Sequence, residues 1–140
     1  MAFKIMIDAN VLLDFTLKRE FYEDAKKILQ LAVDGDVRAY TTPSIIHICG
    51  YWLSKAYGRQ QAKKLLLTLL ADVTVIDITH EVALAALHSK INNIEDALQY
   101  YTAINHKIGY FISRDKPLKN NSMPTLSVYT PREFIEALFQ

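Results

Sequence analysis

The sequence contains few of the residues that mark secreted, fibrous or disordered proteins. It has one cysteine, Cys49, so no disulfide can form within the chain, which favours a reducing compartment. Glycine and proline number four each, too few for long linkers or low-complexity segments. Apolar runs are too short to span a membrane, and the N-terminal MAFKIMID lacks the apolar region of a signal peptide. We therefore expect a cytoplasmic protein without membrane contact.

The sequence also lacks an excess of charge of either sign. Its 16 basic and 15 acidic residues give a net charge of +1, which argues against binding to nucleic acid by charge alone. Hydrophobic residues make up 51% of the chain, ample for a packed core. A length of 140 residues predicts a single domain over residues 1–140.

Short apolar runs alternate with helical patterns along the chain. We expect strands at residues 3–7, 37–41, 73–76, 109–113 and 126–129. Apolar residues at helical spacing predict helices that begin near residues 9, 20, 43, 60, 80, 95 and 131. This alternation predicts an α/β fold with a parallel central sheet covered on both faces. Right-handed crossovers then bring the carboxyl ends of all strands to one edge.

Three aspartates lie where predicted elements meet. Asp8 and Asp115 follow strand-like runs, and Asp96 lies in the first turn of a predicted helix. Each has an ordinary explanation on its own, as a helix cap, a partner of a helix dipole or a loop residue. The predicted topology brings all three to one edge, where carboxylates repel one another unless a hard cation neutralises them. Carboxylate-held Mg²⁺ or Mn²⁺ is suited to hydrolysis of phosphodiester bonds.

Neighbouring residues are candidates for supporting roles. Asn10 can hydrogen-bond a carboxylate or a water on the metal, while Glu95 and Ser113 adjoin the acids. Asp14 is expected to be an exposed helical residue. Arg114 offers a bidentate contact to phosphate, although an outward-pointing surface arginine is the ordinary alternative. The candidate contacts to an RNA backbone are Arg114, Lys116, Lys18 and Arg19.

The runs IDANVLLD, EDALQYYTAI, YFISRD and VYTPREFIEAL resemble the PIN-domain family, and most closely its small toxins of the VapC type. The likeness extends from Phe3 to about Leu138, with the motifs in the order of the family. It implies a three-layer α/β/α sandwich and cleavage of RNA that depends on Mg²⁺ or Mn²⁺. It also implies that Asp8, Asp96 and Asp115 are the catalytic, metal-binding acids. A toxin of this type would have an antitoxin protein as its partner.

One position departs from the family pattern. The helix after the second strand usually carries an acidic residue, and our alignment places Ile48 there, between His47 and Cys49. An isoleucine cannot bind a metal, so a PIN-like domain with weak or no cleavage that binds nucleic acid or protein is the alternative. A flavodoxin-like nucleotide binder is a third possibility, but the sequence lacks a glycine-rich loop after the first strand.

Two apolar segments predict self-association. IIHICGYWL and LLLTLL carry more apolar residues than one face of a small domain requires, and together with the family likeness they predict a homodimer. Large aromatic residues are mostly well buried, so Tyr51 and Trp52 are expected in the core rather than at the interface.

Overall fold

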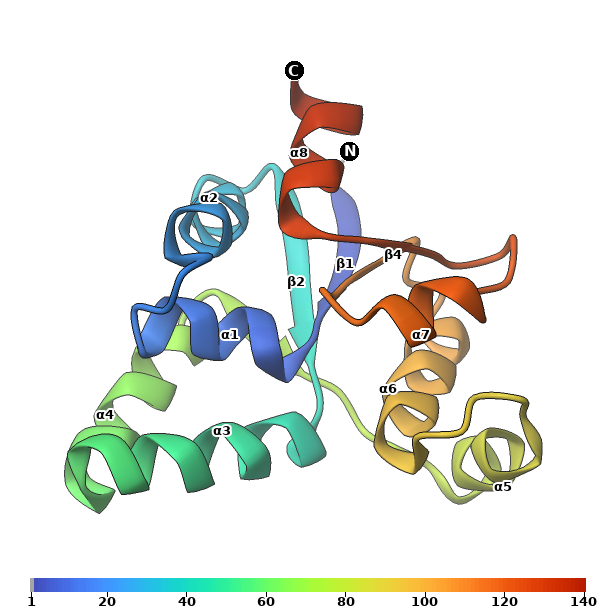
Figure 1. The fold of residues 1–140 in the computed structure, drawn as a ribbon, viewed down its shortest axis with the longest axis horizontal. Coiled ribbons are helices and arrows are strands. Elements are labelled where there is room, and N and C mark those ends of the chain that lie inside the picture. Colours follow the sequence, from blue (N-terminus) through green and yellow to red (C-terminus); the bar gives the residue numbers. More distant parts are fainter. Residues whose placement is uncertain (1) are drawn as a thin grey trace.

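A computed structural model describes residues 2–140, which form five strands and eight helices (Figure 1). The strands are β1 (Phe3–Ile7), β2 (Val37–Thr41), β3 (Val73–Val75), β4 (Tyr110–Ile112) and β5 (Ser127–Tyr129). The helices are α1 (Ala9–Thr16), α2 (Tyr22–Val33), α3 (Pro43–Tyr57), α4 (Arg59–Leu70), α5 (His80–His88), α6 (Ile94–Asn105), α7 (Lys116–Asn120) and α8 (Pro131–Phe139). The predicted strands and helices are confirmed, apart from small differences at their ends.

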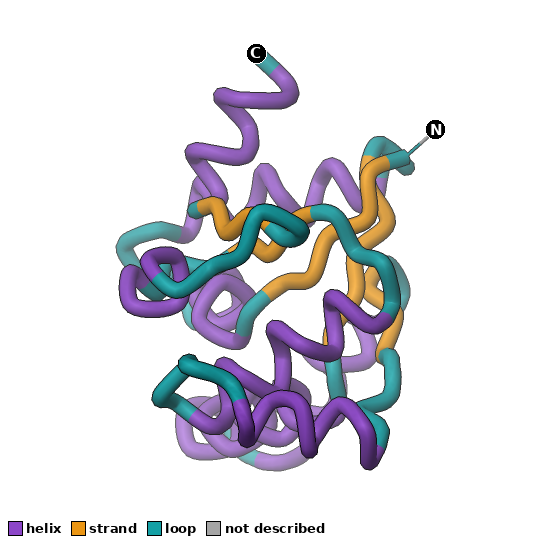
Figure 2. The backbone as a smooth tube through the Cα atoms, turned by 90° about the vertical axis from the view of Figure 1, so that its right-hand side faces the viewer, coloured by secondary structure: helices purple, strands orange, loops and turns teal. Residues whose placement is uncertain are grey.

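The five strands pair in parallel in the order β3-β2-β1-β4-β5. The chain builds the sheet outward from β1 to β3, then returns through α5 and α6 to place β4 against the other side of β1. Helices α1 to α4 lie on one side of the sheet and α5 to α7 on the other (Figure 1), and a view turned by 90° shows the strands enclosed between helices (Figure 2). The predicted three-layer α/β/α fold is therefore confirmed.

The direction of strand order reverses between β1 and β4. In parallel α/β sheets, such a reversal opens a crevice at the carboxyl ends of the two strands, because their following loops turn to opposite faces. Hydrogen bonding continues past the end of β1, where the Asp8 N–H donates to the carbonyl of Ile112 at 3.0 Å. The structure therefore places Asp8 and the loop after β4 at the mouth of this crevice.

The core is built on the central strands. Ile5, Met6 and Ile7 of β1 and Phe111 and Ile112 of β4 are fully buried. The consecutive residues Ile5, Met6 and Ile7 are all apolar because helices cover both faces of a parallel sheet. The carboxyl ends of β1 and β4 therefore adjoin fully buried residues of the core.

Helix α7 was not predicted, since its five residues were expected to be a loop. The Asp115 side chain caps it by accepting a hydrogen bond from the Leu118 N–H at 3.0 Å, and Pro117 occupies its first turn. Leu118 is its one buried residue, so the segment has no apolar periodicity that sequence reading could detect. The N-cap of α7 is its relevant feature for the candidate site, because the capping hydrogen bond orients the Asp115 carboxylate.

The expectation that Tyr51 and Trp52 lie in the core is wrong. Their exposed fractions are 54% and 46%, and the two rings pack edge to face on the outer side of α3. Helix α3 buries Ile45, Cys49 and Leu53 instead, a spacing of four residues that marks its inner face. Within residues 2–140, no helix is both long enough and apolar enough to cross a membrane.

Candidate metal centre

Asp8 is the most buried acid of the candidate site. It is 8% exposed and caps α1, with Oδ1 accepting a hydrogen bond from the Ala9 N–H at 2.7 Å. Its Oδ2 accepts a hydrogen bond from the Ser113 hydroxyl at 2.7 Å. The Asn10 amide lies near the same oxygen at 3.5 Å, too long for a strong bond. Asp8 is thus held by α1 on one side and by the loop after β4 on the other.

Ser113 connects Asp8 with Asp115. Its Oγ donates to Asp8 and accepts a hydrogen bond from the Asp115 N–H at 3.0 Å. The buried hydroxyl therefore links the ends of the two central strands across 105 residues of sequence. The interaction explains why a small hydroxyl residue, rather than an apolar one, occupies this buried position.

Asp96 approaches from the opposite face of the sheet. Asn93 caps α6 by accepting the Asp96 N–H at 3.0 Å, which fixes Glu95 and Asp96 in the first helical turn. Asp96 and Asp115 line the same small cavity, with a volume of about 180 Å³. The structure thus brings Asp115 next to both Asp8 and Asp96.

The pKa values show that these carboxyl groups act on one another. Burial raises the pKa of Asp8, and the charge of Asp115 raises it further, against hydrogen bonds from Ser113 and Ala9 that lower it. Burial raises the pKa of Asp96 to about 7, helped by a hydrogen bond with the Asp115 side chain and by the charges of Asp8, Asp115 and Glu95. Burial and the charge of Asp8 raise the pKa of Glu95. Four acids therefore share one electrostatic environment.

The donor atoms fit a hard divalent cation. Asp8, Asp96 and Asp115 supply carboxylate oxygens, the ligands that Mg²⁺ and Mn²⁺ prefer. The Asn10 Oδ1 is buried beside Asp8 and has no hydrogen-bond partner, and a buried acceptor of this kind suits a cation or its water. Over the described residues 2–140, however, no three His, Cys, Asp or Glu side chains are arranged as a ready-made metal site. The acids lie near one another, but they are not arranged to hold a metal without some movement.

Helix α3 approaches the cluster without supplying an acid. Burial raises the pKa of the Cys49 thiol to about 12, and the negative charges of Asp8 and Glu95 act in the same direction. His47 faces Glu95 closely enough to lower its pKa. Ile48 is half-buried and packs against the core. This turn of α3 therefore places a thiol and an imidazole near the acids.

An ion pair between Asp14 and Arg114 was not predicted, and the expectation that Asp14 is exposed is wrong. Asp14 is fully buried, and it accepts hydrogen bonds from Arg114 Nε at 2.7 Å and Nη2 at 2.9 Å. The guanidinium also lies 4.6 Å from the centre of the Phe21 ring. Because Arg114 stands between Ser113 and Asp115, the pair fastens the loop after β4 to α1. Sequence reading offered no signal for this pairing across 100 residues.

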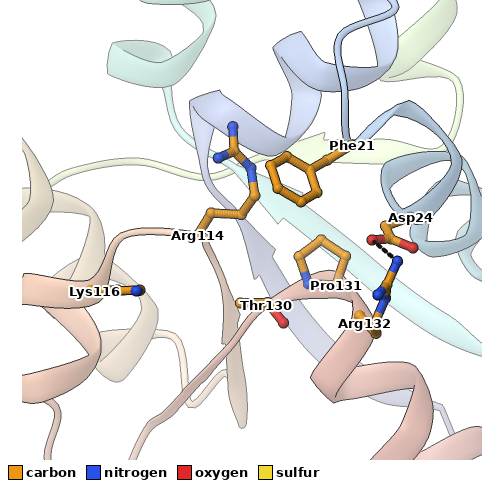
Figure 3. A pocket seen from close by; sticks show the side chains of 7 residues that line it. All are labelled: Phe21, Asp24, Arg114, Lys116, Thr130, Pro131 and Arg132. Carbon is orange, nitrogen blue, oxygen red and sulfur yellow. Dashed lines mark ion pairs between the residues drawn. The ribbon is translucent and has the colours of Figure 1, made fainter.

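The other predicted basic contacts are exposed. Lys18 and Arg19 lie in the turn between α1 and α2, and Lys116 begins α7. Lys116 and Arg114 border a second, larger cavity beside the acids, which is shown in Figure 3. The expected bidentate contact of Arg114 with phosphate must use the free edge of the guanidinium, since the other edge is already bound to Asp14.

Replacing Asp14 with alanine should destabilise the protein strongly. The change leaves the partly buried Arg114 guanidinium without its partner, so we expect the free energy of unfolding to fall by about 3 kcal/mol. Urea denaturation measures this loss. The matched control is Asp72→Ala, at an exposed aspartate, for which a change within about 0.5 kcal/mol is expected. Equal losses in the two variants would show that the ion pair contributes nothing.

The metal-free protein should lose stability as the pH rises toward neutrality. Folding raises the pKa of Asp96 from 3.8 to about 7, so between these values the folded state holds a proton that the unfolded chain has released. Stability is therefore fully present at low pH and is lost as the pH rises through the folded pKa. In EDTA, the melting temperature of the wild type should fall more between about pH 5 and about pH 8 than that of Asp96→Asn. Identical pH profiles of the wild type and Asp96→Asn would contradict the raised pKa of Asp96.

The chain is similar to PIN-domain proteins in sequence and in fold. Residues 4–117 match the PIN domain family. The structure resembles VapBC2 of Rickettsia felis bound to a promoter DNA fragment, with a TM-score of 0.72, 16% identity and coverage of 91% of this chain and 98% of that one. It also resembles a toxin–antitoxin complex of Klebsiella pneumoniae, with a TM-score of 0.69, 21% identity and coverage of 91% and 97%.

A third similar structure is VapC20 of Mycobacterium tuberculosis, a toxin that cleaves the sarcin–ricin loop. Its TM-score is 0.68 at 14% identity, with coverage of 86% of this chain and 97% of that one. No curated protein sequence matches the chain significantly. The family match covers most of the chain and includes Asp8, Asp96 and Asp115. The chain therefore belongs to the PIN-domain family.

Proposed function

We propose that this protein is a cytoplasmic, metal-dependent endoribonuclease that hydrolyses RNA phosphodiester bonds, and that it is the toxin of a toxin–antitoxin pair. The observation that carries the proposal is the gathering of Asp8, Glu95, Asp96 and Asp115 where the strand order reverses, with raised pKa values for the first three. Strongly perturbed carboxyl groups in a crevice are typical of functional sites. Helix capping accounts for Asp8 and Asp115 one at a time, but it does not account for the burial of several carboxyl groups together.

In this proposal, Asp8, Asp96 and Asp115 hold Mg²⁺ or Mn²⁺ and are the catalytic acids. The bound ion supplies a more acidic water and neutralises negative charge that develops on the phosphate. Ser113 holds the Asp8 carboxylate in place, as its hydrogen bond at 2.7 Å shows. Asn10, with its unpaired Oδ1, is suited to orient a water beside Asp8.

RNA and an antitoxin are the proposed macromolecular partners. Similar folds occur in VapBC2, in a Klebsiella toxin–antitoxin complex and in a toxin that cleaves the sarcin–ricin loop, and these relatives support the proposal by analogy. Glu95 lies beside Asp96 and adds to the negative field that a divalent ion would balance. The basic residues proposed to contact the RNA backbone are Lys18, Arg19, Lys116 and, through the guanidinium edge not bound to Asp14, Arg114.

Cleavage of RNA should require both Mn²⁺ or Mg²⁺ and Asp8. Asp8→Asn keeps the side-chain shape and removes a charge, so we expect the cleavage rate to fall by at least about a hundredfold, as when one electrostatic group is removed from an active site. EDTA should abolish cleavage by the wild type. The control is Asp72→Asn, which should cleave normally. Equal cleavage by wild type and Asp8→Asn, or cleavage in EDTA, would rule out this mechanism.

A second candidate function is a PIN domain that binds RNA or protein but cleaves weakly. The observation that favours it is the turn of α3 at residues 47–49, which faces the acids without a carboxylate. A hard cation binds more weakly when its site has fewer charged oxygen ligands. Binding of RNA without cleavage at any Mn²⁺ concentration would identify this function.

The variant Ile48→Glu tests how far the lack of a carboxylate at position 48 limits cleavage. Ile48 is half-buried, so a carboxylate at this position keeps some access to water. We expect a folded variant that cleaves at a lower Mn²⁺ concentration, by about tenfold, because a further carboxylate ligand raises affinity for the ion. Ile48→Gln controls for size. A folded Ile48→Glu with unchanged metal dependence would show that Ile48 does not weaken the site.

We also propose a homodimer. Tyr51 and Trp52 on α3 and Leu67 on α4 leave about half or more of their surface exposed, with fractions of 54%, 46% and 69%. Exposed apolar groups of this size are typical of interfaces. Sedimentation at micromolar concentration should give the mass of a dimer, and Trp52→Ala should shift the protein toward the monomer. A wild-type monomer would contradict the proposal.

A further inference from the structure

A cavity of about 320 Å³ lies beside the acid cluster, and it is lined by three separate parts of the chain. Phe21 and Asp24 come from the start of α2, Arg114 and Lys116 flank Asp115, and the junction of β5 with α8 completes the wall. In Figure 3, Lys116 lies at one side and Arg132 at the other, with Phe21 and Pro131 between them. The cavity thus has an apolar centre and basic sides.

The charges around this cavity favour an anionic occupant. Three cations, on Arg114, Lys116 and Arg132, line it together with one carboxylate, Asp24. Asp24 pairs with Arg132 at 3.3 Å, while Lys116 is exposed and makes no ion pair within residues 2–140. Asp14 neutralises Arg114 through one edge of the guanidinium. Lys116 is therefore the strongest candidate to bind a phosphate.

The apolar part favours a flat aromatic group. Phe21 keeps 38% of its surface exposed, although it packs on Arg114, and Pro131 forms the adjoining wall. The case for a ligand here does not rest on the N-terminus of α8, where the capping box already satisfies the backbone N–H groups of Thr130 and Glu133. An exposed aromatic ring beside cations is the arrangement with which proteins bind single-stranded nucleic acid.

We propose that this cavity binds one nucleotide of a single-stranded RNA substrate, next to the phosphate that is cleaved. The base packs on Phe21 and Pro131, and a phosphate of the same strand contacts Lys116. The proposal rests on the proposed function and adds the place where the RNA strand leaves the acid cluster. Asp115 connects the acid cluster with the cavity. The residues on either side of it line the cavity, while its own carboxyl group faces Asp96.

The test measures binding of a fluorescein-labelled, ten-nucleotide single-stranded RNA in EDTA, where cleavage is absent. Phe21→Ala should weaken binding by about tenfold without changing its salt dependence, because it removes stacking and no charge. Lys116→Ala should weaken binding and reduce the slope of log affinity against log salt by about 0.7, the value for one phosphate contact on a single strand. Phe21→Trp should retain tight binding.

Two matched controls lie away from the cavity, one on α5 and one on α4. Leu87→Ala removes an exposed apolar side chain and Lys63→Ala an exposed lysine, and neither should alter the affinity beyond about twofold. If Phe21→Ala proves unstable, Lys116→Ala still tests the proposal, since that side chain is exposed and makes no hydrogen bond within residues 2–140. Affinities of Phe21→Ala and Lys116→Ala equal to those of the two controls would overturn the proposal.

The same variants separate this proposal from the proposed function. Cleavage in Mn²⁺ with RNA affinities that do not depend on Phe21 or Lys116 would retain the nuclease and reject the cavity as a subsite. Affinities that depend on both residues in a protein that never cleaves would retain the subsite and reject the nuclease. A labelled ten-residue polyglutamate peptide is the probe for a protein ligand. Binding of this peptide that is lost in Phe21→Ala, with RNA binding unchanged, would overturn the RNA assignment.

Discussion

Mutual repulsion among four carboxyl groups at the carboxyl ends of β1 and β4 is the constraint on which the rest of the structure depends. Asp8 tolerates burial because the Ala9 N–H and the Ser113 hydroxyl donate to its two oxygens at 2.7 Å each. The two donors are in position only because α1 begins directly after β1 and because β4 ends beside β1. The sheet order, the cap of α1 and the serine after β4 therefore form one arrangement, in which the loss of any member leaves a buried charge without partners.

Protons and a divalent cation are alternative ways to satisfy this constraint. Without metal, Asp96 keeps its proton up to a pKa of about 7 because burial and the neighbouring acids disfavour its charged form. A bound cation would reverse this effect and release the proton, so metal affinity and pH are linked.

The sequence predicted what is local and periodic. The strands are short apolar runs between turns. Asp8 and Asp115 follow two of these strands and Asp96 begins a helix, so parallel topology was enough to bring the acids to one edge. Asp14 was misjudged because it lies on a helix, where the pattern of α1 suggests exposure, while its partner Arg114 is 100 residues away. Tyr51 and Trp52 were misjudged because their size predicts burial, whereas the helical period of α3 faces them outward. The helical period of α3 thus held the signal for Tyr51 and Trp52, whereas no local pattern indicates the ion pair of Asp14.

The Asp14–Arg114 pair explains how the loop after β4 can contribute side chains both to the acid cluster and to the adjoining cavity. Fixed to α1 by bonds of 2.7 and 2.9 Å, Arg114 sets the direction of the backbone at residues 113–115. Ser113 and Asp115 then face the acids, while Arg114 and Lys116 line the adjoining cavity. Side chains of successive residues in an extended segment point to opposite sides, so a rigid loop separates negative and positive groups by one residue. A bidentate arginine suits this role better than a lysine, because its planar fork fixes direction as well as distance.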